Sequence, residues 1–279
     1  MTSCDTPAGI QAPFPLLERR QPKARLVEIF SSIQGEAELI GVRQIFVRFF
    51  GCNLRCAWCD SPESLTAPKG PLLPGRVETV PGSGEFRPVD NPVDLEAVMG
   101  PIRHLARVPH HSVSFTGGEP LLHARFLEAL LPEVRAFGLP TYLETNGLLA
   151  DHLRRVVGHL DWVAMDLKPP SCTYDPTPDW LTRHREFIRV VLQQGPGGPG
   201  LFAKLIVSAD ADEAEVRSAL QLLAEEAPSV SLTLQPVTPF ATVTAAPDVE
   251  SMLRWHSIAS EYVALVRVLP QLHKLIQVL

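Results

Sequence analysis

The sequence predicts an α/β protein built around a sheet of mostly parallel strands. Two observations lead to this fold class. Short apolar runs of strand length alternate with amphipathic helical segments of about 10–15 residues along most of the chain. Polar residues stand directly after several of these runs, where parallel strands place a ligand site. Repeated βαβ units of this kind form an open doubly wound sheet, or a full or partial barrel.

Composition indicates a globular chain and excludes several function classes. Of the 279 residues, 45% are hydrophobic and 20% are charged, which is enough apolar material for a substantial core. The formal net charge of −6 gives no basic surface, so we expect neither nucleic acid nor a membrane as partner. Residues 1–25 carry prolines and charges rather than the apolar run of a signal peptide. We expect a cytoplasmic protein in which these residues form an N-terminal arm.

The first expected strand, Arg43–Gly51, is an apolar run that leads into a loop of cysteines. The span 61–93 follows, with seven prolines and four glycines, and is typical of an inserted loop or flap. We therefore expect residues 26–279 to form a single domain that carries an insertion at about 61–93. A helix is expected at Asp94–Arg107.

The later elements alternate regularly between strand and helix. The expected strands are Ser112–Gly118, Thr141–Gly147, Trp162–Lys168, Leu201–Ser208, Val230–Pro236 and Val263–Leu269. The expected helices between them are His123–Phe137, Asp151–Val157, Trp180–Leu192, Ala211–Glu226 and Val249–Ser260.

Three of the five cysteines, Cys52, Cys56 and Cys59, fall within eight residues. An odd cysteine count in a chain without an export signal argues against a disulfide framework. A structural zinc ion takes four protein ligands, so it would need a remote cysteine or histidine as well. Three cysteines in one tight loop suit a 4Fe–4S cluster in which one iron has no protein ligand and can bind a small molecule.

Other polar residues have both a functional and a structural interpretation. The turn Thr116–Glu119 is either an ordinary strand-to-helix turn or a close approach to a ligand, with Glu119 accepting a hydrogen bond from an ammonium group. Arg48 lies inside an apolar strand and needs either an anionic ligand or a nearby Glu. Asp166 and Lys168 share one face of a strand, either as part of a site or as a surface pair.

The Cys-x3-Cys-x2-Cys loop, followed by Gly-Gly-Glu-Pro, resembles the radical S-adenosylmethionine enzymes. More narrowly, the chain resembles the 7-carboxy-7-deazaguanine synthase family from about Val27 to the C-terminus, apart from much of 61–93. The segments that carry this narrower resemblance are Ile33–Glu36, Phe46–Leu54, Trp58–Asp60, Glu144–Gly147 and Pro270–Lys274.

The resemblance implies a partial (β/α) barrel of the radical S-adenosylmethionine type with mostly parallel strands. It implies a 4Fe–4S cluster on Cys52, Cys56 and Cys59, whose free iron binds S-adenosylmethionine. An electron donor such as flavodoxin or ferredoxin would trigger release of a 5′-deoxyadenosyl radical. That radical would abstract hydrogen from C6 of the pterin 6-carboxy-5,6,7,8-tetrahydropterin, giving 7-carboxy-7-deazaguanine, a queuosine precursor, with loss of ammonia. Mg²⁺ and a homodimer are implied as well.

The resemblance also implies roles for residues of this sequence that match the family's motifs position by position. It implies no catalytic residue beyond the cluster ligands. The implied substrate contacts are Ile33, Gln34, Gly35, Arg48, Thr116 and Leu279. Ser61 falls on the hydroxyl that ligates Mg²⁺. The implied S-adenosylmethionine contacts, with Glu119 added from the interpretation above, are Gly118, Glu119, Asp166, Leu167, Lys168, Gln235, Pro236, Val237 and Thr238.

Three positions depart from the family pattern. Ala37 replaces the glycine that usually closes Gln-Gly-Glu-Gly, so this turn is expected to differ. Ser61 stands where many members have Thr, which keeps the hydroxyl but loosens its rotamer. The insertion after Ser61 is long, so no lid is carried over from the family.

Two alternatives remain open at the level of the sequence. One is an activase that uses the same cluster chemistry to place a glycyl radical on a partner protein. The other is a protein that only carries a cluster or a zinc ion, for electron transfer or metal binding. An assay for 5′-deoxyadenosine, with and without the pterin, separates the three hypotheses.

Overall fold

The computed structural model describes residues 21–65, 73–239 and 243–279. One sheet runs through them, and its strands are β1 (Leu26–Ile33), β2 (Arg43–Phe49), β3 (Gly75–Glu78), β4 (Phe86–Val89), β5 (Ser112–Gly117), β6 (Thr141–Thr145), β7 (Trp162–Leu167), β8 (Gly200–Val207), β9 (Ser231–Pro236) and β10 (Leu265–Val268). The helices are α1 (Leu95–Leu105), α2 (Ala124–Ala136), α3 (Ala150–Leu153), α4 (Trp180–Leu192), α5 (Glu213–Glu226), α6 (Val249–Ser260) and α7 (Leu272–Ile276).

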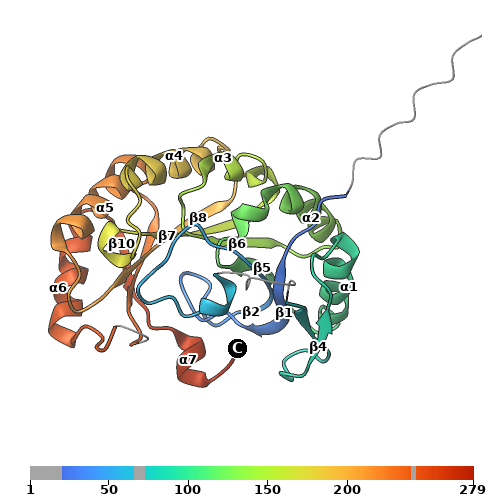
Figure 1. Ribbon diagram of the computed structural model, residues 1–279. Helices are drawn as coiled ribbons and strands as arrows, with labels where there is room; N and C mark the ends of the chain where they lie inside the picture. Colours follow the sequence, from blue (N-terminus) through green and yellow to red (C-terminus); the bar gives the residue numbers. More distant parts are fainter. Residues whose placement is uncertain (1–20, 66–72, 240–242) are drawn as a thin grey trace, which may run out of the picture.

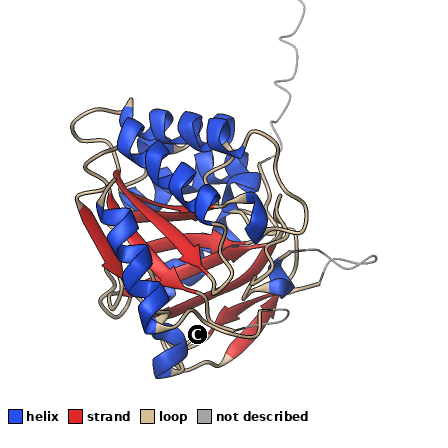
Figure 2. Cartoon of the chain, turned by 90° about the vertical axis from the view of Figure 1, so that its left-hand side faces the viewer, coloured by secondary structure: helices blue, strands red, loops and turns tan. Residues whose placement is uncertain are grey.

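The strand order is β10-β9-β8-β7-β6-β5-β2-β1-β3-β4. From β2 through β10 every neighbouring pair is parallel, whereas β1 is antiparallel to β2 and β4 is antiparallel to β3. Because β4 and β10 do not pair with each other, the sheet is curved but not closed. Helices α1 to α6 form an arc outside it (Figure 1), and they cover one face of the sheet (Figure 2). This architecture confirms the predicted α/β class and the partial barrel.

Alternation along the strands separates the core from a polar inner face. On β5, Val113 and Phe115 belong to the core and are 0% exposed. Ser114 and Thr116, at the alternate positions, donate hydrogen bonds to Glu144 of β6. Each large apolar side chain buried beneath the helices contributes about 1.5–3 kcal/mol to folding. The polar residues on the opposite face add no such apolar burial, so this face is suited to bind a polar ligand.

Several helices begin at an aspartate that caps free N–H groups. The side chain of Asp94 accepts from Ala97 at the start of α1, and Asp248 accepts from Ser251 at the start of α6. Such a cap typically contributes about 1 kcal/mol. Together with their apolar stripes, these caps explain why the helices begin close to where the sequence predicts.

The first strands differ most from expectation. The span 61–93, expected as a loop or flap, contains β3 and β4, and both strands extend the sheet beyond β1. Short strands of this kind are specified by a partner far along the chain, so a proline-rich composition hides them. Residues 66–72 lie outside the described residues. The division into an arm and a single domain stays a prediction.

The arm expected at residues 1–25 is described only from residue 21 onward. Ala24 is buried there and exchanges two backbone hydrogen bonds with Val93, so this part of the arm packs against the body. Within the described ranges, no helix combines the length and apolar composition needed to cross a bilayer.

Candidate active site

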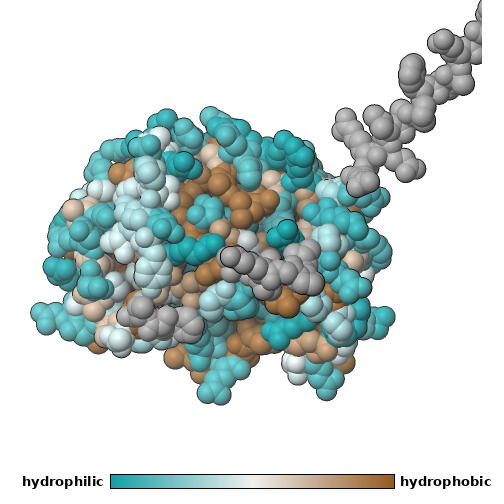
Figure 3. Space-filling model, in the orientation of Figure 1, coloured by the Kyte–Doolittle hydropathy of each residue, from teal (hydrophilic) through white to brown (hydrophobic). Residues whose placement is uncertain are grey.

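A cavity of about 420 Å³ opens at the carboxyl ends of the parallel strands. Figure 3 shows the face of the molecule that carries the C-terminal segment, with apolar residues gathered near its middle and polar residues around them. The sequence-predicted residues that line the cavity are Ile33, Gln34, Gly35, Arg48, Cys52, Cys56, Cys59, Ser61, Thr116, Gly118, Asp166, Lys168, Gln235, Val237, Thr238 and Leu279. Glu119, Leu167 and Pro236 are absent from this lining.

The cysteine loop is held against the end of β5 by backbone contacts. The N–H of Glu119 donates to the carbonyl of Gly51 over 2.7 Å. A β-carbon on Gly118 would lie 2.2 Å from that same carbonyl oxygen, so only glycine allows the two segments to approach this closely. The Gly-Gly turn therefore positions the cysteine loop, which is a packing role that the sequence pattern alone does not reveal.

The buried side chain of Glu119 stabilises this turn by hydrogen bonds. It is 0% exposed, and its carboxylate accepts hydrogen bonds from Thr145 and from the N–H groups of Leu121 and Asn146. Burial raises the pKa of Glu119 to about 7. Thr145 and Asn146 line the cavity, so Glu119 lies directly behind its wall, and its contact with the ammonium group of S-adenosylmethionine stays a prediction.

The three loop cysteines are partly exposed, and all three line the cavity. Among the described residues, one group of His, Cys, Asp and Glu side chains has its ligand atoms within 4.8 Å of one another, and it contains no cysteine. The cysteine sulfurs are therefore spread more widely than the ligands of a single zinc ion. Three thiolate donors on one loop that lines the cavity suit a cubane cluster that leaves one iron open to the cavity.

The surroundings of the three thiols differ. Burial raises the pKa of Cys52 to about 11 and also raises the pKa of Cys59. The pKa of Cys56 is lowered to about 6, chiefly by its hydrogen bond with the side chain of Cys172. Cys172 itself is buried.

Charged residues from neighbouring strands form a network beside the cysteines. Asp166 and Lys204 are register partners on β7 and β8, and their side chains pair at 3.0 Å. Lys204 also pairs with Glu36, and Lys168 pairs with Asp166 at 2.8 Å. Burial opposes the charge on Lys204, but Asp166 and Glu36 outweigh it and raise its pKa. Asp166 and Lys168 thus pair with each other at the wall of the cavity.

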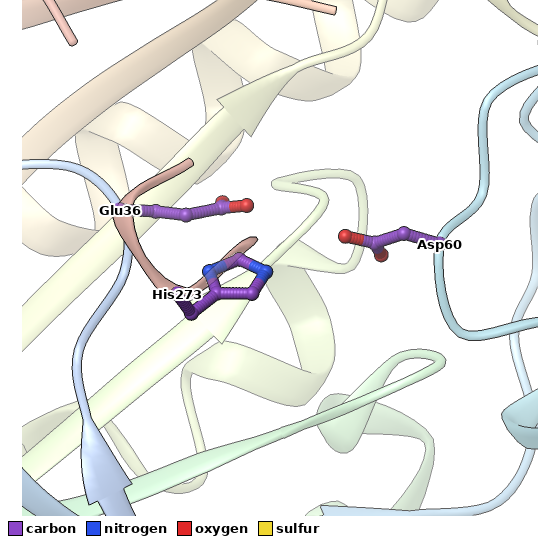
Figure 4. A group of neighbouring side chains, drawn as sticks. All are labelled: Glu36, Asp60 and His273. Carbon is purple, nitrogen blue, oxygen red and sulfur yellow. The ribbon is translucent and has the colours of Figure 1, made fainter. Parts of the chain in front are cut away.

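Glu36, Asp60 and His273 form the group whose ligand atoms lie within 4.8 Å of one another. Figure 4 shows these side chains directed toward a common space from three separate segments. The amide nitrogen of Gln271 donates to Glu36 over 2.6 Å and to Asp60 over 2.9 Å, so one amide group binds both carboxylates.

Arg48 pairs with a nearby glutamate, which is one of the two partners, an anionic ligand or a Glu, that its place in an apolar strand predicts. Its Nε donates to Glu28 over 2.8 Å, and the other oxygen of that carboxylate accepts from Arg76 of β3. Arg48 still lines the cavity, and its guanidinium lies 5.7 Å from the ring centre of Phe30. The carboxylate of Glu28 therefore fixes the arginine at the cavity wall.

Sequence reasoning missed several lining residues. Lys204 and Tyr142 lie on inner faces of strands, and Asp60 directly follows the last loop cysteine. A lysine inside the apolar run Leu201–Val207 was a usable signal, because a charge on a buried strand needs a partner. Glu144, noted only within a turn motif, accepts hydrogen bonds from Gln34 and Thr116.

Comparison with known proteins agrees with this geometry. The family model described as the radical SAM superfamily matches residues 46–189, which span the cysteine loop and the strands that follow it. The crystal structure of QueE from Escherichia coli aligns with a TM-score of 0.55 over 90% of this chain and 95% of that one, at 21% identity, and so shares the fold. Fold and site together define an enzyme of the radical S-adenosylmethionine class.

The curated relatives narrow the class. The 7-carboxy-7-deazaguanine synthase of Geobacter sulfurreducens is 39% identical over 260 residues, covering 91% of this chain and 97% of that protein. The synthase of Methanothermobacter thermautotrophicus is 32% identical over 267 residues, covering 90% and 96%. The chain belongs to the 7-carboxy-7-deazaguanine synthase family.

Proposed function

We propose that this protein converts 6-carboxy-5,6,7,8-tetrahydropterin into 7-carboxy-7-deazaguanine with loss of ammonia, as a lyase of deazapurine and queuosine biosynthesis. The observation that carries the proposal is a shared cavity. The three cysteines line one part of it, and Arg48, with the Gln34–Glu36 segment, lines another. This is the arrangement required of an enzyme that generates a radical next to a small anionic substrate.

Cys52, Cys56 and Cys59 would hold the 4Fe–4S cluster. When bound, the cluster and S-adenosylmethionine together supply the 5′-deoxyadenosyl radical that abstracts hydrogen from C6 of the pterin. Gly118, Asp166, Lys168, Gln235, Val237 and Thr238 line the cavity and are the proposed cofactor contacts. The ion-paired Asp166 and Lys168 present opposite charges there, which suits a zwitterionic amino acid moiety.

The substrate would lie against β1 and β2. The Nε of Arg48 donates to Glu28, and its two terminal nitrogens, Nη1 and Nη2, can face a substrate carboxylate at the same time. Gln34 and Thr116 are both held by Glu144, so their positions are fixed before a ligand enters. Ile33, Gly35 and Leu279 complete the proposed contacts.

Mg²⁺ belongs to the same proposal. Ser61 lines the cavity next to Asp60, and its hydroxyl donates to that carboxylate over 3.4 Å. A hydroxyl and a nearby carboxylate are oxygen ligands of the kind that Mg²⁺ prefers, with substrate oxygens and waters filling the other positions.

Partners and location are proposed from the family resemblance. The reaction needs one electron from outside the protein, which an iron–sulfur protein or flavoprotein such as ferredoxin or flavodoxin would provide. The edge strand β10 carries the exposed residues Leu265 and Val268, a surface that suits the proposed homodimer. A cytoplasmic location stays a prediction.

An anaerobic turnover assay tests the proposed function. Reduced, iron-loaded protein is mixed with S-adenosylmethionine, with or without the carboxytetrahydropterin, and 5′-deoxyadenosine and deazaguanine are measured. We expect the deazapurine to appear only with the pterin. Cleavage that ignores the pterin would favour the activase alternative, and no cleavage would favour a protein that only carries the metal.

A further inference from the structure

Three charged side chains stand in a row across the neighbouring strands β2, β1 and β3. Glu28 of β1 is the register partner of Arg48 on β2 and of Arg76 on β3. One oxygen of its carboxylate accepts from Nε of Arg48 over 2.8 Å, and the other accepts from Nε of Arg76 over 2.8 Å. Glu28 is 5% exposed, so water has little access to this carboxylate. All three side chains line the cavity.

This row leaves one positive charge without a partner at the cavity wall. Across the described ranges, Glu28 is the one carboxylate that lies within ion-pair distance of either arginine. Asp60, which also lines the cavity, is paired with Lys274 at 3.3 Å instead. Two guanidinium groups therefore share a single negative charge, and an anionic group of a ligand would complete the pairing.

The remaining N–H groups of both arginines are held in place before a ligand enters. Glu28 binds Nε of Arg48, and it binds both Nε and Nη2 of Arg76. The other terminal nitrogens of the two arginines donate to no described residue. The guanidinium of Arg76 lies 4.3 Å from the ring centre of Phe86 on β4, and that of Arg48 lies 5.7 Å from the ring centre of Phe30. Because the planar groups are already ordered, binding an anion costs little side-chain entropy.

We propose that Arg76 is a specificity-determining residue, which together with Arg48 binds the carboxylate of the pterin substrate. The inference rests on the proposed function, because it needs a substrate that carries a carboxylate. It deepens that function by assigning a ligand contact to β3, a strand formed within the span 61–93. A pterin without the carboxylate leaves the extra positive charge unpaired, so this wall selects against it.

Binding of two pterins distinguishes this role from simple attachment of β3 to the sheet. Iron-loaded protein is titrated anaerobically with 6-carboxy-5,6,7,8-tetrahydropterin, and separately with 5,6,7,8-tetrahydropterin, which has no carboxylate. Both titrations use isothermal calorimetry at fixed concentrations of S-adenosylmethionine and Mg²⁺. No reductant is added, so turnover does not consume the ligand. Binding of S-adenosylmethionine without a pterin is measured as a second reference.

Three variants are compared with the wild type. Arg76→Met keeps a flexible apolar stem beside Phe86 but removes the charge. Arg76→Lys keeps the charge but loses the planar fork. Arg87→Met is the matched control, because Arg87 is an exposed arginine on the neighbouring strand β4 and is absent from the cavity lining.

We expect the loss of affinity to be confined to the carboxylated pterin. Arg76→Met should raise its Kd about tenfold, because a charge-assisted contact is lost, and Arg76→Lys should raise it about threefold. The Kd values of tetrahydropterin and of S-adenosylmethionine should change less than about twofold, since neither depends on this contact. Arg87→Met should bind all three ligands as the wild type does.

The proposal is overturned if Arg76→Met binds the carboxylated pterin as tightly as the wild type. It is also overturned if this variant loses affinity for all three ligands to the same extent, because Arg76 would then only support the cavity wall. A wild type that forms no deazapurine in the turnover assay contradicts the proposed function instead, so the two failures are distinguishable.

Discussion

Gly35 lies so close to His273 that a β-carbon added to Gly35 would be 1.9 Å from the imidazole Nδ1. The N–H of Leu272, next to this histidine, donates to the carbonyl of Gly35 over 2.9 Å. The Gln34–Glu36 segment and the C-terminal tail therefore form a continuous wall of the cavity, although they stand at opposite ends of the described chain.

Gly35→Ala should separate these two segments. Because the added methyl group cannot fit beside His273, the tail has to move, and the substrate side of the cavity opens. We expect KM for the pterin to rise at least about tenfold, while binding of S-adenosylmethionine changes little. Equilibrium binding of each ligand checks this, with Gly158→Ala, which has open space for a β-carbon and no positive φ, as the control. Equal losses of affinity for the pterin and for S-adenosylmethionine would contradict the assignment of this wall to the substrate side of the cavity.

Arg48→Lys should weaken pterin binding more than cofactor binding. A lysine cannot keep one nitrogen on Glu28 while presenting a planar fork to a carboxylate. The loss of a charge-assisted bidentate contact predicts about 1.5–3 kcal/mol weaker binding of the pterin. The surface variant Arg103→Lys, on α1, is the control. A substrate role for Arg48 is refuted if both ligands lose affinity to the same extent.

Ser61→Ala should raise the Mg²⁺ concentration needed for half-maximal activity, because one oxygen ligand is lost. Ser61→Thr keeps the hydroxyl and should retain the wild-type requirement. Product formation is followed during titration of chelator-treated enzyme with Mg²⁺. If the alanine variant responds to Mg²⁺ as the wild type does, the hydroxyl is not a ligand.

Ala37→Gly should stabilise the protein. Ala37 has φ = 55°, in the left-handed region that favours glycine and strains a β-carbon. Relief of strain, partly offset by a more flexible unfolded chain, predicts a gain of up to about 1 kcal/mol. Urea unfolding measures it. As a control, Ala129→Gly, inside α2, should lower the free energy of unfolding by about 1 kcal/mol. A loss of stability at both positions would show that Ala37 is not strained.

His184 should make the protein sensitive to acid. It is 0% exposed, and burial, reinforced by the nearby charge of Lys168, lowers its pKa to about 3. Between pH 6.5 and pH 3 the unfolded chain binds a proton that the folded chain does not, so stability falls as the pH falls. At about 1.36 kcal/mol per pH unit, the loss between pH 6.5 and pH 5 is about 2 kcal/mol.

The variant His184→Gln isolates this effect. A glutamine oxygen can accept the hydrogen bond that the N–H of Lys168 donates to the imidazole over 3.1 Å, but it does not titrate. The free energy of urea unfolding at pH 7 and pH 5 is compared for both proteins. The variant should lose less stability than the wild type on acidification, and parallel losses would show that His184 is not the responsible group.

Local sequence patterns determined much of the fold and the centre of the site. Helices α4 and α6 have the bounds that their periodicity predicts, because a buried helical face imposes its period on a contiguous segment. The cysteine loop was readable for the same reason, since its three sulfurs are close in sequence.

The tertiary structure alone decided the contacts between distant segments. The pairing of β1 with β3, Glu28 between Arg48 and Arg76, Glu119 bound by Thr145, and Thr173 paired with Cys56 each join residues far apart in the chain. A one-dimensional pattern records which face a side chain occupies, but its partner depends on strand register and sheet curvature. Those are set only when the whole sheet assembles.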